Sequence, residues 1–323
     1  MSNVRMSVAM CTYNGAQFLS EQLKSIALQG RLPGELVVCD DGSTDDTISI
    51  LRAFAERTSF LVRIFSNEDR LGPGKNFEKA ISLCDGDIIV FCDQDDVWRP
   101  QKLAKLAETF DQCPDAVYVF SDADIIEEDK QPAGQTMWDA VGLARNLNRF
   151  SGVGQLRLLL KHNLIAGASM AFRASFRQVV LPIPVGWMHD YWIVLLGSAV
   201  SRGAPVAEPL YLYRRHASQV CGWRKQTFGQ DVQESIASGH DVSVKKVEQF
   251  REIQRRLEEV RGLMKCPEDR LELLRQKETH LLKRAALRSA RGLSRAMGVL
   301  TEASTGRYQR FSNSWLSIVR DLK

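Results

Sequence analysis

Short apolar runs alternate with helical stretches through the first 120 residues of the chain. The runs are rich in β-branched side chains and read SVAMC (7–11), ELVVC (35–39), LVRIF (61–65), DIIVF (87–91) and AVYVF (116–120). Between the first two runs, one apolar helical face is expected from Phe18, Leu19, Leu23, Ile26 and Ala27. This alternation predicts an α/β fold, with a mostly parallel sheet whose strands are joined by crossover helices.

Two of these helices have clear start signals. Ser43 and Thr44 precede an acidic first turn, Asp45 and Asp46, so a helix is expected to begin there. Pro100 stands where the first residue of a helix tolerates proline, which predicts the start of the fourth helix.

The regular alternation ends near residue 121, and the chain is irregular as far as about residue 165. Further strands are expected at LIAGASMAF (164–172) and PLYLYRRH (209–216). A helix is expected around DYWIVLLGSAV (190–200), between these two strands.

The C-terminal part of the chain has a purely helical pattern. This pattern begins at Asp241, and a second helix is expected to begin at Pro267. We therefore expect an α/β domain over residues 1–225 and a helical region over residues 226–323, with a linker within 222–240.

Composition and charge narrow the class of protein. The 323 residues are 44% hydrophobic and 25% charged, which is typical of a globular protein. The net charge of +4 is too small on its own to suggest a nucleic-acid partner. It is also uneven, because residues 1–225 carry 24 Lys and Arg against 26 Asp and Glu, whereas residues 226–323 carry 19 against 13. The basic surface is therefore expected away from the acidic segments.

Cysteine usage and the lack of targeting signals suggest a cytoplasmic protein. Seven cysteines without a CxxC pair are typical of buried thiols in a reducing compartment. The N-terminus has no signal-peptide pattern, and the longest apolar run, WIVLLGSAV, is shorter than the roughly 18 residues that a transmembrane helix needs.

Polar and acidic side chains stand at the carboxyl ends of three predicted strands. In open α/β sheets ligands bind beyond these ends, so the side chains are expected along one edge: Thr12, Asn14, Asp40, Asp41, Asp93 and Asp95. Carboxylates bind Mg²⁺ or Mn²⁺, and a hydroxyl and an amide suit ribose and base edges. This set predicts a site for a nucleotide with a divalent cation.

Each acidic cluster also has a purely structural interpretation. The segment 41–46 could form a turn and a helix N-cap, and Asp95 with Asp96 could cap the helix expected at Pro100. The position of both clusters at strand ends on the same edge favours the ligand site.

Five segments resemble a known family when they are taken together and in order: MCTYNGAQFLSEQLKSI, ELVVCDDGSTDDT, GDIIVFCDQDDVWRPQKL, MHDYW and YRRH. The chain resembles the family 2 glycosyltransferases, which are inverting enzymes of GT-A fold, and among them the rhamnosyltransferase-like branch of bacterial polysaccharide synthesis. The resemblance covers about residues 6–220. It implies a GT-A fold, Rossmann-like and flanked by helices, and here it would carry a helical C-terminal extension.

The resemblance implies roles for residues of the donor site. Thr12, Tyr13 and Asn14 would line the nucleotide pocket, and Asp41 would read the pyrimidine edge. Separately, LGPGKNFEKAI (71–81) places Asn76 at the start of a helix, where it could approach phosphate or sugar, although the segment has neither the GxGxxG nor the P-loop spacing.

The resemblance also implies a metal site. Asp93 and Asp95 match the DxD element, with Asp93 near the ribose and Asp95 on a divalent metal, Mn²⁺ or Mg²⁺, that bridges the diphosphate. His216 in YRRH would join this metal, and Arg214 or Arg215 would neutralise phosphate charge.

A second group of residues concerns the acceptor. An inverting transfer needs a base for the acceptor hydroxyl, and Asp190 of MHDYW matches the catalytic carboxylate of the family. His189 could orient Asp190 or act as a helix cap, and Trp192 could stack on a sugar or pack in the core. Gly167 would allow close approach in a turn near the acceptor.

A basic stretch near the C-terminus has three interpretations. Arg284, Arg288, Arg291 and Arg295 recur at spacings of four, three and four, on the helical face opposite Leu282, Ala286, Leu293 and Met297. The arginines could meet an anionic membrane, form a solvated face of a packed helix, or form a dimer contact.

These expectations define a function and its rivals. We expect a metal-dependent inverting glycosyltransferase that moves a sugar from dTDP-rhamnose or a UDP-sugar to a glycan or lipid-linked glycan in surface polysaccharide synthesis. A sugar nucleotidyltransferase would want a glycine- and arginine-rich loop after the first strand, which CTYNGAQ lacks. A catalytically inactive nucleotide-sugar or glycan-binding protein would be expected to lack Asp190 or a DxD carboxylate.

Overall fold

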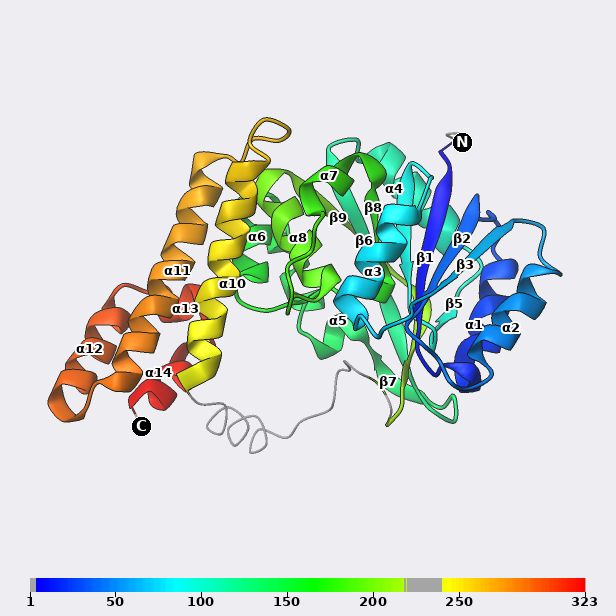
Figure 1. Ribbon diagram of the computed structural model, residues 1–323. Helices are drawn as coiled ribbons and strands as arrows, with labels where there is room; N and C mark the ends of the chain where they lie inside the picture. The colour runs from blue at the N-terminus through cyan, green and yellow to red at the C-terminus, as the bar shows by residue number, and fades with distance from the viewer. Residues whose placement is uncertain (1–3, 218, 220–239, 323) are drawn as a thin grey trace. The chain divides into compact units, whose positions relative to one another are not determined.

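The chain forms two compact units in the computed structural model, which describes residues 4–217, 219 and 240–322 (Figure 1). Unit 1 comprises residues 1–149 and 164–220, and unit 2 comprises residues 150–163 and 221–323. The linker expected within 222–240 falls on residues outside the described ones, apart from residue 240 itself.

The domain division expected from the sequence omits one segment of unit 2. Helix α6 (Gly152–Leu159) contacts α11 (Glu268–Ser289), so a short piece from the middle of the chain packs with the C-terminal helices. Its residues Leu156 and Leu159 are buried, which is consistent with hydrophobic packing of this segment within unit 2.

A nine-stranded sheet forms the centre of unit 1 (Figure 1). Its strands are β1 (Met6–Thr12), β2 (Glu35–Asp40), β3 (Leu61–Ser66), β4 (Ile88–Cys92), β5 (Val97–Trp98), β6 (Ala116–Glu127), β7 (Pro132–Thr136), β8 (Met170–Arg173) and β9 (Arg202–Arg215). Their order is β3-β2-β1-β4-β8-β6-β9-β5, with β7 on β6. All five early strands expected from the sequence are confirmed, and β1, β2, β3 and β4 pair in parallel.

The pairing of the later strands differs from the simple parallel sheet. β8 lies between β4 and β6 and runs antiparallel to both, so β6 has the direction of β4 without pairing with it. β9 then pairs in parallel with β6. The apolar pattern identified these strands but carried no information on which strand would separate β4 from β6.

Helices cover the sheet of unit 1. They are α1 (Ala16–Ala27), α2 (Thr47–Ala55), α3 (Pro73–Leu83), α4 (Lys102–Gln112), α5 (Met137–Ala140), α7 (Arg177–Val180) and α8 (His189–Val200), with 3₁₀ turns at 144–149, 167–169 and 174–176. α3 packs on β1 and β2 and contacts α8, while α4 packs on β6 and β9. The central strands are consequently buried, and β2 and β4 have no exposed residue.

Two helix starts lie later than the sequence indicated. α2 begins at Thr47, because Ser43 and Thr44 are used in contacts with the first strand's loop instead of capping the helix. α4 begins at Lys102 with Gln101 at the N-cap position, so Pro100 lies two residues before the helix.

The described part of unit 2 is helical. Besides α6 and α11 it contains α10 (His240–Glu259), α12 (Gly292–Ser304), α13 (Arg307–Phe311) and α14 (Ser314–Leu322). The helix predicted from Pro267 is confirmed, with Pro267 as the N-cap residue of α11. Among the described residues, no helix is both long enough and apolar enough to cross a bilayer.

The single basic helix expected over residues 284–295 is wrong. α11 ends at Ser289, Ala290 is extended, and Gly292 has φ +55°, which favours glycine and redirects the chain into α12. Arg284 and Arg295 therefore belong to two different helices and do not share one continuous face.

A close contact between β9 and β6 allows the packing of the core to be tested by mutation. Tyr118 of β6 is fully buried, and its hydroxyl shares a 2.8 Å hydrogen bond with Ser198 Oγ. A Cβ atom at Gly203 would lie 2.2 Å from the Tyr118 ring, so only glycine fits at this position of β9.

We expect Gly203→Ala to destabilise unit 1 by about 1–3 kcal/mol, because the added methyl overpacks the buried ring. The measurement is the thermal or denaturant midpoint of unfolding. Gly30→Ala is the matched control, since its Cβ would lie at an ordinary 3.6 Å from Pro100 O. Equal midpoints for the two variants would contradict this packing.

Candidate functional site

Four strand ends meet at one edge of the sheet in unit 1. β1, β2 and β4 are parallel and end at Thr12, Asp40 and Cys92, and β9 has the same direction and ends at Arg215. The structure therefore brings together the segments 12–15, 40–46, 93–96 and 216, which are distant in sequence.

The carboxylates after β4 are crowded, with His216 beside Asp95 and the positive charge of Lys102 acting on Asp93 and Asp96. Burial raises the pKa of Asp93 to about 7, and the negative charges of Asp95 and Asp190 raise it further in the same direction. The Asp95 carboxylate is 2.8 Å from His216 Nε2, where it holds the imidazole at the end of β9. Asp95 and His216 are thus placed together, as the resemblance implied for a metal site.

The donor set suits a metal ion that is completed by a ligand. Among the described residues, no group of three or more His, Cys, Asp or Glu side chains is arranged to hold a metal. Asp95 and His216 supply one oxygen and one nitrogen, and a Mg²⁺-type ion commonly takes one or two protein carboxylates with substrate phosphates in the remaining positions. The crowded negative charge next to this pair fits the same conclusion.

Asp96 does not act as a helix cap. It is buried, its Oδ1 accepts a 3.3 Å hydrogen bond from Arg214 N, and its Oδ2 has no hydrogen-bond partner. The cap interpretation is wrong because α4 begins six residues later, with Gln101 as its N-cap.

The loop after β1 is bonded to the loop after β2. Thr12 Oγ1 donates to Asp40 Oδ2 at 2.8 Å, and the Asn14 carboxamide oxygen accepts from Thr44 N at 2.8 Å. Asn14 has φ +45°, an uncommon conformation that asparagine tolerates. These bonds hold both loops at the sheet edge, with Asn14 exposed and Thr12 buried.

Asp41 and Asn76 are largely occupied by contacts within the protein. The Asp41 carboxylate accepts from Asn67 Nδ2 at 2.8 Å, Leu71 N at 2.7 Å and Gly72 N at 2.9 Å. The Asn76 amide donates to Cys39 O at 2.8 Å. Both side chains therefore position the loop before α3, and direct contact with a nucleotide stays a prediction.

Tyr13 is held by two residues that the sequence did not single out. Gln94 forms a pair of hydrogen bonds with the backbone of Tyr13, at 2.9 Å to its N–H and 3.1 Å to its carbonyl. The Arg70 guanidinium lies 3.8 Å from the Tyr13 ring centroid, so one ring face is already covered. No pattern pointed to Gln94, because a middle residue of a DxD element carries no spacing signal.

Asp190 is held in the first turn of α8 by two backbone N–H groups. Gly167 N donates to its Oδ2 at 3.2 Å, and Tyr191 N donates to its Oδ1 at 2.6 Å. The N-cap residue of α8 is Met188, so Asp190 does not occupy the cap position. Its negative charge also raises the pKa of Asp93.

His189 is a neutral, buried neighbour of Asp190. Its ring stacks on Phe77 at a centroid distance of 3.8 Å, neither ring nitrogen has a hydrogen-bond partner, and burial lowers its pKa to about 3. A Cβ atom at Gly167 would lie 2.6 Å from His189 Nε2, so the close approach at Gly167 is to this imidazole. His189 is neither a helix cap nor an exposed acceptor contact.

Trp192 is a core residue, so its predicted acceptor contact is wrong. Its side chain is 1% exposed, its indole N–H donates to Val180 O at 2.8 Å, and it packs edge-to-face on Trp187. It faces inward because α8 is apolar on nearly all sides.

Arg214 and Arg215 are committed to other partners. Arg214 is 1% exposed and pairs with Glu21 at 2.9 Å, while its Nε donates to Asp95 O at 3.0 Å. Arg215 pairs with Glu127. Arg214 therefore fastens the backbone of the DxD segment to β9, and this contact replaces the phosphate contact expected from the sequence.

A comparison with family models shows which protein family the chain belongs to. The family model described as glycosyl transferase family 2 matches residues 7–180, which is more than half of the chain. The chain belongs to this family. This assignment agrees with the order of the acidic segments along the sheet edge.

Relatives in sequence are also named as glycosyltransferases. An uncharacterized glycosyltransferase of Nostoc sp., alr2836, is 27% identical over 67% of this chain and 66% of its own length. The dTDP-rhamnosyl transferase RfbG of Shigella flexneri is 38% identical over 29% of this chain and 34% of its own length. The chain spans about two thirds or less of these relatives.

Solved structures show that this family 2 chain has the GT-A glycosyltransferase fold. Staphylococcus aureus TarS, residues 1–349, matches with a TM-score of 0.55 at 17% identity, over 86% of this chain and 71% of that chain. The mannosyltransferase PcManGT of Pyrobaculum calidifontis matches with a TM-score of 0.56 at 19% identity, over 99% and 86%.

A buried lysine lies beside the acidic segment of this family 2 chain and was missed from the sequence. Lys102, the first residue of α4, is fully buried, and its Nζ donates to Ala168 O at 2.6 Å and lies 4.2 Å from the Trp98 ring centroid. Burial lowers its pKa to about 8, while the charges of Asp96 and Asp93 act to raise it. A lysine in the first turn opposes the helix dipole, and this unfavourable position was the available signal of an acidic partner.

We expect Lys102→Met to destabilise the protein by about 1–3 kcal/mol, because the buried Ala168 carbonyl loses its hydrogen-bond donor and the acidic segment loses a nearby positive charge. The free energy of unfolding from denaturant titration measures this effect. Lys105→Met on the same helix is the control, since its ion pair with Glu208 is solvent-exposed and should contribute little to stability. A loss no larger than that of the control would show that Lys102 does not compensate the cluster.

Proposed function

We propose that the protein is a metal-dependent inverting glycosyltransferase. It would move a sugar from a nucleotide-diphosphate donor, dTDP-rhamnose or a UDP-sugar, to a glycan or lipid-linked glycan in surface polysaccharide synthesis. The observation that supports this most is the grouping of Asp93, Asp95, His216 and Asp190 at one sheet edge, in a chain of family 2.

The donor class is supported by the names of similar proteins. RfbG of Shigella flexneri is named a dTDP-rhamnosyl transferase. TarS has been solved with UDP and with UDP-GlcNAc, and PcManGT with GDP-Man and Mn²⁺. Apart from the metal ion, these ligands are nucleotides or nucleotide sugars, so a nucleotide-diphosphate sugar is the donor class that we infer for this chain.

Asp95 and His216 would hold a divalent metal, Mn²⁺ or Mg²⁺. When bound there, such an ion would neutralise charge on the donor diphosphate. Thr12, Tyr13 and Asn14 would lie along the nucleotide, and Asp93 would lie toward its ribose.

Asp190 would act as the base in the transfer. Its carboxylate would accept the proton of an acceptor hydroxyl while that oxygen forms a bond to the anomeric carbon. The bond from the anomeric carbon to the diphosphate oxygen breaks in the same step, so the product has inverted configuration and the nucleoside diphosphate leaves. The N–H groups of Gly167 and Tyr191 hold the carboxylate in a fixed orientation for this role.

The cellular setting follows from the acceptor. A lipid-linked glycan presents its sugar at a membrane surface, so we infer a cytoplasmic enzyme that works at the inner face of the cell membrane. The contact would be peripheral.

We expect Asp190→Asn to reduce the rate of sugar transfer by about 10²–10⁴-fold, because the amide cannot take the proton. Single-turnover kinetics with the active donor and acceptor would measure it, and Asp111→Asn, at an exposed position of α4, is the control. Near-normal transfer by Asp190→Asn would remove Asp190 from the base role.

We also expect a nucleotide sugar with Mn²⁺ to raise the melting temperature of the wild-type protein. A ligand that binds only the native state at about 100 times its Kd adds ~2.7 kcal/mol to the stability. In Asp95→Ala the part of the shift that depends on Mn²⁺ should vanish.

Product analysis separates the rival functions in the same experiment. Release of the nucleoside diphosphate supports the glycosyltransferase, and release of pyrophosphate would identify a nucleotidyltransferase. Binding of a donor without any turnover across a panel of acceptors would favour a binding protein.

A further inference from the structure

In α14, the last helix of unit 2, polar side chains face the interior and apolar side chains face outward. Along α14 the fully buried side chains Ser317 and Asp321 are 3% and 0% exposed, whereas Trp315, Val319 and Leu322 are 57%, 43% and 46% exposed. The three exposed residues have spacings of four and three, so they form one outward apolar stripe. A helix that only packs on its own unit would bury this stripe.

The neighbouring helix adds a second stripe. On α12, Leu293, Met297 and Leu300 are 77%, 60% and 65% exposed, at the same spacings of four and three. α12 and α14 contact each other. We refer to these six residues of α12 and α14 as the apolar stripes.

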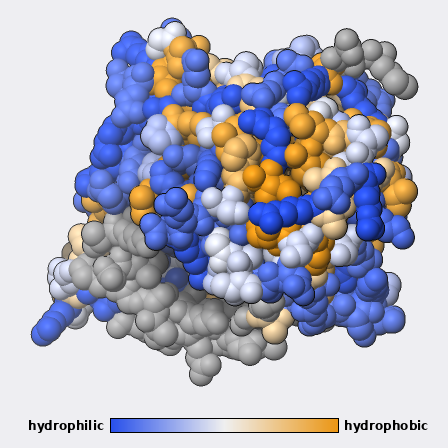
Figure 2. Space-filling view, turned by 45° about the vertical axis from the view of Figure 1, so that its right-hand side comes forward, coloured by the Kyte–Doolittle hydropathy of each residue, from blue (hydrophilic) through white to orange (hydrophobic). Residues whose placement is uncertain are grey.

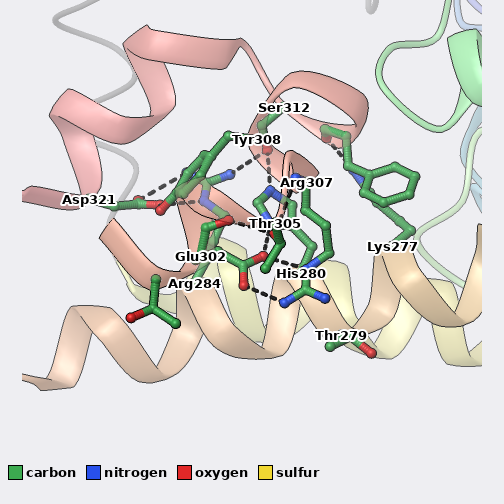
Figure 3. Close-up of polar contacts among 12 residues, drawn as sticks. Lys277, Thr279, His280, Arg284, Glu302, Thr305, Arg307, Tyr308, Ser312 and Asp321 are labelled. Atoms are coloured by element: carbon green, nitrogen blue, oxygen red, sulfur yellow. Dashed lines mark hydrogen bonds and ion pairs between the residues drawn. The ribbon is translucent and has the colours of Figure 1, made fainter. Parts of the chain in front are cut away.

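A network of polar groups lies between the helices, beside buried hydrophobic residues such as Val299 and Phe311 (Figure 3). The His280 ring bridges Glu302 at 2.6 Å and Ser312 at 2.8 Å. Asp321 accepts from Arg284 Nε at 2.5 Å and from the Tyr308 hydroxyl at 2.7 Å. α14 turns its carboxylate inward because this network satisfies it, and the apolar stripe is thereby left outside.

The network also keeps the acidic side chains of residues 281–323 in the interior, away from the apolar stripes. Residues 281–323 carry nine Lys and Arg and two acids, Glu302 and Asp321, for a net charge of +7. Both acids are buried. Among the described residues of this segment, Lys283, Arg291 and Arg310 are exposed, and the surface carries positive charge only.

We propose that the apolar stripes of α12 and α14, with the surrounding cations, form a docking surface for an anionic lipid bilayer. Exposed Trp, Leu and Met on helices with a basic surround are the features of an interfacial membrane contact, in which apolar side chains enter the headgroup boundary. This inference rests on the proposed function in one respect: it assigns the peripheral membrane contact proposed there to a defined surface of unit 2.

Charge favours the bilayer over a second copy of the chain. In a two-fold dimer the same patch would face itself, and the positive surfaces would repel each other. An anionic leaflet supplies the opposite charge, worth about 1 kcal/mol for each Lys or Arg near the surface. This surface differs from the basic helical face expected from the sequence, because Arg284 forms an ion pair with the buried Asp321.

The test is co-sedimentation of the full chain with vesicles of phosphatidylcholine alone or mixed with phosphatidylglycerol. We expect binding to the mixed vesicles, weakened by salt, and at least about tenfold weaker binding to phosphatidylcholine alone. The double variant Leu293→Ser with Met297→Ser removes apolar surface without a change of charge, and we expect about tenfold weaker binding to the mixed vesicles.

The control uses exposed hydrophobic residues of unit 1. Figure 2 shows that the face it draws has a hydrophobic area interrupted by hydrophilic residues, so exposed apolar side chains are not confined to unit 2. Leu28→Ser with Leu32→Ser changes two side chains that are 61% and 46% exposed. This variant should bind the mixed vesicles as the wild type does.

Three results would overturn the proposal: no binding to the mixed vesicles, equal loss in the control, or a dimer that only Leu293→Ser with Met297→Ser dissociates. Donor-induced thermal stabilisation is measured on the same variants. Vesicle binding without donor stabilisation would overturn the proposed function alone, and donor stabilisation without vesicle binding would overturn the docking surface alone.

Discussion

Repulsion between carboxylates at the end of β4 is the constraint on which the arrangement of unit 1 depends. Asp93, Asp95 and Asp96 stand within four residues, and α8 brings the charge of Asp190 to the same place. The protein offsets this with groups from remote strands and turns: Lys102 from α4, His216 and Arg214 from the end of β9, and the N–H of Gly167. The later strands are therefore as necessary to the site as the strands that carry the acidic residues.

The compensation is incomplete. Asp96 Oδ2 has no hydrogen-bond partner, and the pKa of Asp93 is raised to about 7 by burial and by its neighbours. A site that keeps negative charge at a cost to stability is poised for a cation, because binding then relieves repulsion that folding left in place. The same cost explains the fully buried Lys102, whose own desolvation would be unfavourable without the acids.

The sequence predicted what depends on local pattern and failed where distant contacts decide. The early strands, α8 and the start of α11 were predicted correctly, because buried strands and helical faces leave a period in the sequence. The position of β8 between β4 and β6 left no such trace, and neither did the packing of segment 150–163 with the C-terminal helices. The sequence left the roles of Trp192 and Asp96 open for a related reason, since a Trp or an Asp near a motif looks the same in sequence whether it is buried or exposed.

The two units treat buried charge in opposite ways, which separates their roles. In unit 1 the carboxylates crowd together at the sheet edge and Asp96 Oδ2 has no hydrogen-bond partner, whereas in unit 2 Asp321 and Glu302 are satisfied internally and hydrophobic side chains are left outside. All the contacts described for the candidate site belong to unit 1, and all those of the polar network belong to unit 2. Membrane contact through unit 2 would thus raise the effective concentration of a lipid-linked acceptor without altering the groups that carry out the transfer.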